Sequence, residues 1–285
     1  MARLKSSARL QDAVEAAVAF YEEAPTDALT VETAWSEVEV EAADWQEAFG
    51  SPEPGTPHNE ARDDAWEALL DILVDKHGGD DDLDEADVRA SLAGNGELRD
   101  AFRAAWPILH ADDLVSDLWS VPAYLRLCAP WLSPEERVTL RRPEGSPWTQ
   151  ADLPLLDAMR RRLGDPAASA LRQRGATAIA ENRAYMDDVV SGLLASDDDP
   201  ESPLPYLNRA SIREALIDRD VAPAGKRDAL AGPFGHIIVD EAQELTDAQW
   251  QMVLARCPSR AVTVVGDRGQ ARDGFPRAGT SASRG

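Results

Sequence analysis

The stretch "HIIVDEAQELTDAQW", residues 236–250, decides how the fold of this sequence is interpreted. Its consecutive β-branched residues at 237–239 run directly into Asp240 and Glu241. A continuous apolar run of this length is typical of a strand in a parallel sheet whose two faces are both covered by helices. We therefore expect a buried strand over 235–240 that ends in two carboxylates.

A helix and a second strand are expected to follow. The pattern of "LTDAQWQMVLARC" (245–257) predicts a helix. Thr246 would be its N-cap and Gln249 its third residue, which together form a capping box. "AVTVVGD" (261–267) is again a buried strand by its pattern. Strand, helix and strand in about 30 residues form a βαβ unit with parallel strands. Ligands of such sheets bind beyond the carboxyl ends of the strands, where Asp267 joins the first two carboxylates.

This arrangement would suit nucleotide hydrolysis. Such a site needs one carboxylate near Mg²⁺ and another group that positions or deprotonates the attacking water. Successive residues leaving a strand point in different directions, so Asp240 can face the metal while Glu241 faces the water. Gln243 and Gln270 offer amides that can contact a γ-phosphate. Taken alone, the first motif could also be an apolar strand that ends in a charged loop by chance. The second motif, "VVGDRGQ" (264–270), follows the next strand, and the two motifs together are more specific than either one.

These residues also carry a family resemblance. "VDEAQELTDAQWQMVLARCPSRAVTVVGDRGQ" (239–270) resembles motifs II and III of the superfamily 1 DNA helicases of the UvrD/Rep type. The same region is most similar to the HelD (HelR) branch, helicase-like ATPases that bind bacterial RNA polymerase in Gram-positive organisms. "APWLSPEERVTLRRPEGSPWTQADLPLLDAM" (129–159) also resembles the segment that this branch inserts into its first motor domain. The resemblance extends over residues 1–270 and is strongest at 129–160 and 235–270.

The resemblance implies ATP and Mg²⁺ as cofactors. By this likeness Asp240 would bind Mg²⁺, Glu241 would be the catalytic base and Gln270 would contact the γ-phosphate. Gln243 and Asp267 complete the expected nucleotide-binding set. The family would use ATP hydrolysis to remodel or recycle complexes of RNA polymerase with nucleic acid.

The sequence departs from the family at the P-loop. The motif GxxxxGK[ST] is absent from the chain. Gly50 and Gly55 have the glycine spacing, but Thr56 stands in place of the lysine; "AGKR" (224–227) lacks the earlier glycine and ends in arginine. Without the loop's amides and lysine, nothing cradles the β- and γ-phosphates.

The arginine motifs and the second motor domain expected after motif III are missing too, so we expect a fragment of a motor. The isolated chain should not hydrolyse ATP, and a complementing chain could supply the missing parts. RNA polymerase is the expected partner, and nucleic acid would be bound only through a complete motor. The alternative is a non-catalytic RNA polymerase-binding module or a decayed gene fragment.

Three regions are expected along the chain. Residues 1–230 should form an acidic, mostly helical insertion domain, and 231–271 a partial α/β motor core of the P-loop NTPase, RecA-like type. The Gly/Ser/Arg-rich tail 272–285 is expected to be disordered. Within the first region the patterns predict helices and one hairpin, at 7–24, 28–40 (the hairpin), 59–79 and 148–164.

The charge is unevenly distributed. The net charge is −23, and residues 1–100 hold 26 acidic and 7 basic side chains, a balance of −19. From 232 to 285 the count is 6 against 6. Such a field repels free nucleic acid and favours basic surfaces, with acidic loops at 80–82 and 197–199 as candidate contacts. Solubility in an acidic proteome is the alternative explanation of the charge, and solvated loop tips that of the loops.

The remaining composition indicates a cytoplasmic protein. No apolar run is long enough to cross a membrane, and the N-terminus has no signal-peptide pattern. Cys128 and Cys257 lie far apart and are expected to be buried thiols in a reducing compartment. The eight tryptophans lie among acidic or apolar neighbours, so packing roles are expected for them rather than base stacking.

Overall fold

The computed structural model of the protein describes residues 2–77, 84–167 and 232–267. Met1–Pro166 and Asp228–Gly285 belong to one compact unit, and Ala167–Arg227 to a second. The described part is mostly helical with two small sheets, as expected for a mainly α domain. The predicted boundary at residue 230, the tail, both acidic loops and Gln270 lie outside the described residues and stay predictions.

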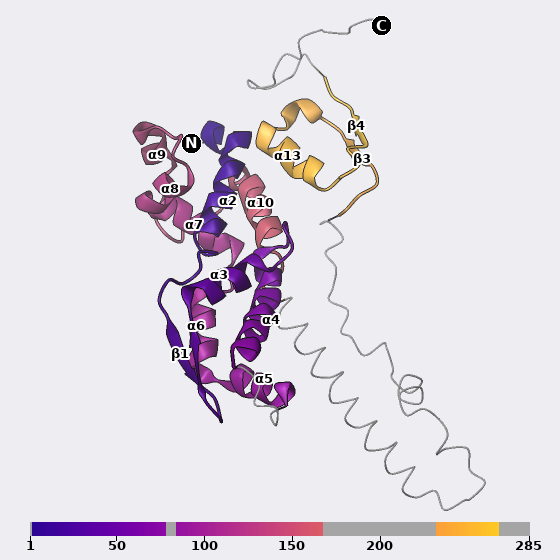
Figure 1. Ribbon diagram of the computed structural model, residues 1–285. Helices are drawn as coiled ribbons and strands as arrows, with labels where there is room; N and C mark the ends of the chain where they lie inside the picture. The colour runs from indigo at the N-terminus through magenta and orange to yellow at the C-terminus, as the bar shows by residue number, and fades with distance from the viewer. Residues whose placement is uncertain (1, 78–83, 168–231, 268–285) are drawn as a thin grey trace, which may run out of the picture. The chain divides into compact units, whose positions relative to one another are not determined.

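The helical part has two separate hydrophobic cores. The first is built mainly by α2, α7, α8 and α10 and includes Val18, Val115 and Met159. Its elements are α1 (Ala2–Lys5), η1 (Ala8–Gln11), α2 (Asp12–Ala19), α7 (Ala111–Ser120), α8 (Pro122–Cys128), α9 (Pro134–Leu140), η2 (Gln150–Asp152) and α10 (Leu153–Leu163). Although α10 is far from α2 in sequence, it packs against both α2 and α7 (Figure 1).

The second core lies between a hairpin and four helices and includes Trp45, Leu69 and Phe102. Its elements are β1 (Leu29–Glu32), β2 (Glu37–Val40), α3 (Ala42–Gly50), α4 (His58–His77), α5 (Glu85–Gly94) and α6 (Gly96–Ala105). The predicted hairpin is confirmed, with antiparallel strands and Val31 opposite Val38. Its outer face is acidic, because Glu32 lies directly opposite Glu37 and both are exposed.

Local sequence signals explain where the helices begin. Ser133 caps α9 with Pro134 as its first residue, and Glu136 completes the capping box as predicted. The segment predicted as one helix over 148–164 begins with the 3₁₀ turn η2, whose capping box joins Thr149 to Asp152, and continues as α10. Cys128 and Cys257 are free and buried, as expected.

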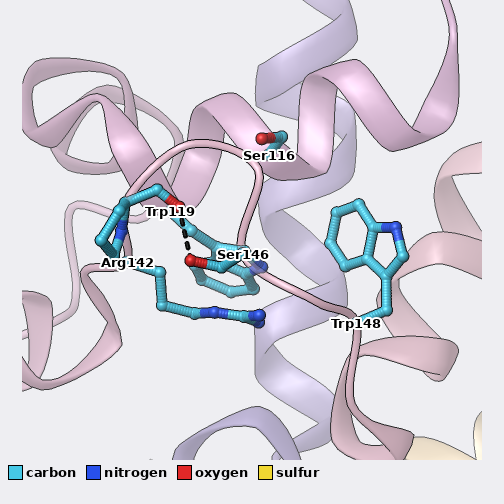
Figure 2. Close-up of a pocket in the computed structure, with 6 residues that line it drawn as sticks. Ser116, Trp119, Arg142, Ser146 and Trp148 are labelled. Carbon is cyan, nitrogen blue, oxygen red and sulfur yellow. Dashed lines mark hydrogen bonds between the residues drawn. The ribbon is translucent and has the colours of Figure 1, made fainter.

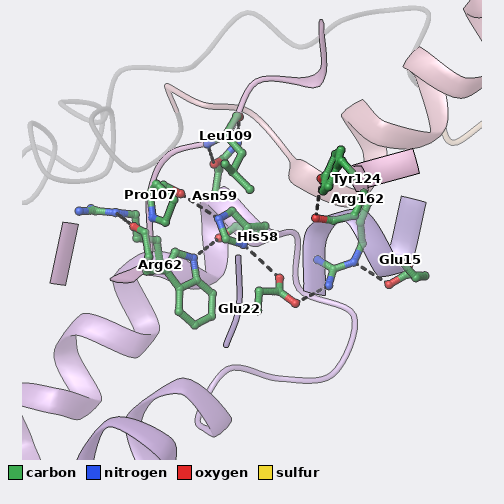
Figure 3. Close-up of polar contacts among 11 residues, drawn as sticks. Glu15, Glu22, His58, Asn59, Arg62, Pro107, Leu109, Tyr124 and Arg162 are labelled. Carbon is green, nitrogen blue, oxygen red and sulfur yellow. Dashed lines mark hydrogen bonds and ion pairs between the residues drawn. The ribbon is translucent and has the colours of Figure 1, made fainter. Parts of the chain in front are cut away.

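A polar seam joins the two cores (Figure 3). The His58 ring is fully buried and stacked on Trp106; its Nδ1 lies 3.1 Å from Glu22 Oε1, and its Nε2 lies 2.9 Å from the Pro107 carbonyl oxygen. The buried Asn59 side chain pairs with the main chain of Leu109 in both directions, at 2.9 Å each. Because these bonds need one geometry, the seam fixes how the two cores meet.

The C-terminal part contains the predicted strand–helix–strand unit. It consists of β3 (Ile237–Val239), η5 (Ala242–Glu244), α13 (Asp247–Ala255) and β4 (Val262–Val264). The two strands are parallel, with Val239 opposite Val264. The capping box of Thr246 and Gln249 at the start of α13 is confirmed. In Figure 1 this part is drawn in orange and yellow, with α13 against η1 and α10.

The burial expected for these strands is wrong. Ile238 is 71% exposed and Val265 is 52% exposed, so among the described residues one face of the sheet is uncovered. An apolar run indicates that a strand can be covered on both sides, but it does not supply the covering elements. On the other face Val239 is buried, while Val264 beside it is 54% exposed.

We expect Glu22 to make the stability depend on pH in the acidic range. Burial raises the pKa of Glu22, but hydrogen bonds with His58 and Arg162 outweigh it and hold the pKa below the ordinary 4.5. Its stabilisation is therefore complete above that value and is lost as the pH falls through the lowered pKa. Urea unfolding at a series of pH values should show Glu22→Gln less stable at pH 7, with the difference from wild type shrinking below pH about 4.5.

The neighbouring, exposed Glu23 provides the control for this measurement. Glu23→Gln should leave the free energy of unfolding close to that of wild type throughout the series. A gap between wild type and Glu22→Gln that stays constant down to the acid transition would contradict the prediction.

Candidate functional site

Main-chain hydrogen bonds continue to join the β3 and β4 segments beyond the ends of the strands. Val265 N donates to the Val239 carbonyl oxygen at 2.8 Å, and Ala242 N donates to the Val265 carbonyl oxygen at 3.0 Å. These bonds bring the loop that follows β3 next to Gly266 and Asp267. The structure thus places the carboxylates of both predicted motifs at one edge of the sheet, as parallel strands require.

A left-handed residue turns the chain at this edge. Glu241 has φ 51° and ψ 38°, a conformation that few residues other than glycine adopt. Asp240 supports the turn, because its Oδ1 accepts a hydrogen bond from Glu241 N at 2.9 Å. The side chains of Asp240 and Glu241 are exposed at the sheet edge, so both are open to a ligand. Strain of about 1–3 kcal/mol in such a backbone commonly marks a functional turn.

Gln243 joins the two loops beneath these carboxylates. It is 6% exposed; its Nε2 donates to Glu241 Oε2 at 2.5 Å, and its Oε1 accepts from Asp267 N at 3.0 Å. The sequence predicts that this amide contacts a γ-phosphate, but in the structure both of its ends are engaged inside the protein. Gln243 thereby links the Glu241 carboxylate to the loop after β4.

Gly266 makes this bridge possible. A Cβ at this position would lie 2.3 Å from Gln243 Oε1 and 3.1 Å from Ala242 N. Any other residue would therefore push the Gln243 side chain away from the Asp267 amide. The Gly-Asp pair after the strand was the sequence signal for a site, and the structure shows that the glycine serves close packing.

The donor set suits a hard cation but not the phosphates. Mg²⁺ is usually held by one or two carboxylates together with water and substrate oxygens. Asp240 and Glu241 could provide the carboxylates. Over residues 2–77, 84–167 and 232–267 no cluster of three or more His, Cys, Asp or Glu is arranged to hold a metal ion. The sequence offers no P-loop for the phosphates.

A small pocket lies elsewhere in the molecule, between α7 and the loop before η2 (Figure 2). Arg142 and Trp148 flank it, with Ser116, Trp119, Pro143 and Ser146. The Arg142 guanidinium is already bound to Asp152 and to the Pro147 carbonyl oxygen. Arg142 is the only cation among the residues that line this pocket, and its guanidinium is already bound within the protein. We therefore assign no ligand to the pocket.

No protein-family model matches the chain, and no curated protein is found to be similar to it. None of the described helices is sufficiently long and apolar to span a bilayer.

Gly266→Ala and Gln243→Ala should have the same local effect. Each removes the bridge and takes the Gln243 acceptor away from the Asp267 amide, so the loop after β4 is held less firmly. Amide hydrogen exchange at Asp267 should speed up in both variants. Because the two changes break one interaction, their effects in the double variant should be smaller than the sum.

Gly235 is the matched control for this experiment, because no atom lies within 4 Å of a Cβ added there. Gly235→Ala should leave exchange at Asp267 unchanged. Fully additive effects of Gly266→Ala and Gln243→Ala would show that the bridge does not couple the two loops.

Proposed function

We propose that this chain is the motif II and III part of a HelD-like, UvrD/Rep-type superfamily 1 helicase. The observation that carries the proposal is the convergence of Asp240, Glu241 and Asp267 at the carboxyl ends of two parallel strands. The matching motifs in 239–270 support the same interpretation. A partial RecA-like, P-loop NTPase core is the fold that this proposal entails.

The proposed chemistry divides between the two carboxylates. Asp240 would hold Mg²⁺, which would neutralise charge on the phosphate oxygens of ATP. Glu241 would orient and deprotonate the attacking water, with its side chain held by Gln243 at 2.5 Å. Gln270 remains the proposed γ-phosphate contact. The phosphate cradle would have to come from outside residues 1–285, because no P-loop motif occurs in them.

The proposed role of the helical part is to bind bacterial RNA polymerase. Its support is the charge of −19 on residues 1–100, together with the exposed carboxylates on the hairpin. Like charges directly opposite each other on a hairpin are unfavourable, so Glu32 and Glu37 do not serve the stability of the fold. A basic surface on the partner would relieve this repulsion.

A non-catalytic polymerase-binding module is the second candidate. The same acidic hairpin supports it, and the missing phosphate cradle favours it over an active motor. The two candidates differ in whether the carboxylates act once a P-loop is supplied by a second chain.

The purified chain should turn over ATP at the background rate, and Glu241→Gln should not change that rate. The physical reason is that no loop amides and lysine hold the β- and γ-phosphates. Phosphate release with ATP and Mg²⁺ is the measurement. Turnover above background that Glu241→Gln abolishes would contradict the prediction and reveal a different phosphate-binding element.

The chain should bind cognate core RNA polymerase faster at low salt than at high salt. Opposite charges chiefly raise the association rate, and salt screens them. Replacing Glu32, Glu37 and Glu39 with Gln should slow association more than it speeds dissociation, as measured by surface-based kinetics at two salt concentrations.

The control variant changes the charge in the other direction. Arg103→Gln with Arg126→Gln removes two exposed cations and should leave association unchanged or faster. If the wild-type chain shows no binding to the polymerase even at low salt, the partner proposal fails.

A further inference from the structure

The helix after the carboxylate loop is held at its beginning by the N-terminal segment. Ala248 N, near the start of α13, donates to the Ser6 carbonyl oxygen at 3.1 Å. Gln11 Nε2 donates to the Ala248 carbonyl oxygen at 3.2 Å. Ala248 is 1% exposed, so these bonds lie in a closed contact. The first amides of a helix have no partners within the helix, and Ser6 satisfies one of them.

The other end of α13 is held by α10. Arg256, the C-cap residue, places Nη1 3.0 Å from Asp157 Oδ2, and its Nη2 bonds to Asp157 Oδ1. Arg256 Nη1 also donates to the Met252 carbonyl oxygen at 2.9 Å. The pair is partly buried, with side chains 24% and 13% exposed. A two-point guanidinium–carboxylate contact fixes orientation as well as distance.

Both anchors lie beside the first hydrophobic core. Ser6 follows Lys5, whose Nζ is buried against Asp152 at the start of α10. Asp157 lies within α10, five residues after Asp152, the N-cap residue of that helix. At the other side, the Thr246 cap of α13 directly follows the carboxylate loop and η5. A shift of α10 or of the N-terminal turn must therefore move α13 and strain the loop that carries Asp240.

We propose that Arg256 is a positioning residue for the carboxylate loop and that α13 couples cation binding at Asp240 to the state of the helical core. The part about the cation rests on the proposed function. Coupling of this kind is reciprocal, so a cation at the loop and a partner on the helical core each change the affinity for the other.

The test uses the full chain with Mn²⁺ alone as a paramagnetic probe. Broadening of the amide signals of Glu241 and Ala242 during a Mn²⁺ titration reports the cation affinity at the loop. Arg256→Gln should weaken that affinity about fivefold, the lower range of measured couplings. Arg256→Lys, which keeps the charge but cannot make the two-point contact, should restore only part of it.

Arg161→Gln is the matched control. Arg161 Nε lies 3.2 Å from the same Asp157 Oδ2, but its side chain is 43% exposed and contacts Asp157 from within α10. It should leave the Mn²⁺ affinity unchanged. A loss of affinity in Arg161→Gln equal to that in Arg256→Gln, or none in Arg256→Gln, would overturn the proposal.

Amide exchange separates this proposal from the proposed function. Exchange at Ala242 and Val265, whose amides close the sheet edge, needs no metal and should be faster in Arg256→Gln than in wild type or Arg161→Gln. If Mn²⁺ broadens no loop signal in wild type, the cation proposal fails. The amide exchange rates at Ala242 and Val265 then test whether Arg256 positions the loop. Equal exchange rates in all variants would exclude a positioning role for Arg256. Gln11→Ala, which removes one hydrogen bond, repeats the test should Arg256→Gln not fold.

Discussion

The hydrogen bonds of the buried Asp152 carboxylate hold together the N-terminal segment, the loop before η2 and the start of α10, to which α13 is attached in turn. The carboxylate accepts hydrogen bonds from Lys5 Nζ, from Arg142 Nη1 at 2.9 Å, and from Thr149 N and Oγ1 at 2.8 and 2.6 Å. Burial raises the pKa of Asp152, but the bonds from Lys5 and Thr149 outweigh it and hold the pKa below the ordinary 3.8. Asp152 thus stays ionised inside the fold.

The cost of this arrangement explains its specificity. Removing each ion from water costs several kcal/mol, and only well-aligned partners offset that. Two cations face one anion here; burial lowers the pKa of Lys5, while Asp152 opposes that shift. Lys5 Nζ lies 4.6 Å from the Trp119 ring centroid, and an aromatic face gives the buried ammonium further stabilisation. Because few geometries satisfy all these groups, the cluster fixes the N-terminal segment on α10.

Sequence patterns predicted the parts of this fold that depend on neighbours along the chain. The capping boxes of Ser133 and Thr246, the hairpin and the parallel strand pair follow from local spacing, and the structure confirms them. The strands are shorter than predicted: β3 was expected over 235–240 and spans Ile237–Val239. The edge at which Asp240, Glu241 and Asp267 meet followed from strand polarity alone.

Contacts between distant segments could not be predicted in the same way. Gln243 bonds to Asp267 N, and Ala248 N bonds to the carbonyl oxygen of Ser6; main-chain partners leave no signature in residue type. The exposure of Ile238 was missed because an apolar pattern does not reveal which elements cover a strand. The internal hydrogen bonds of Gln243 could not be predicted for the same reason: a side-chain amide can bond to a ligand or to the protein itself, and residue type does not say which.

The size of the strand–helix–strand unit makes its attachment to the helical part a physical requirement. In the described residues its sheet has two short parallel strands, and a pair of strands is at best marginally stable without further packing. Its second face is open at Ile238 and Val265. The stability of the carboxylate edge must therefore come largely from α13, which η1 and α10 hold in turn. The loop that carries Asp240 and Glu241 therefore depends for its conformation on contacts that lie more than 80 residues away along the chain, at Ser6, Gln11 and Asp157.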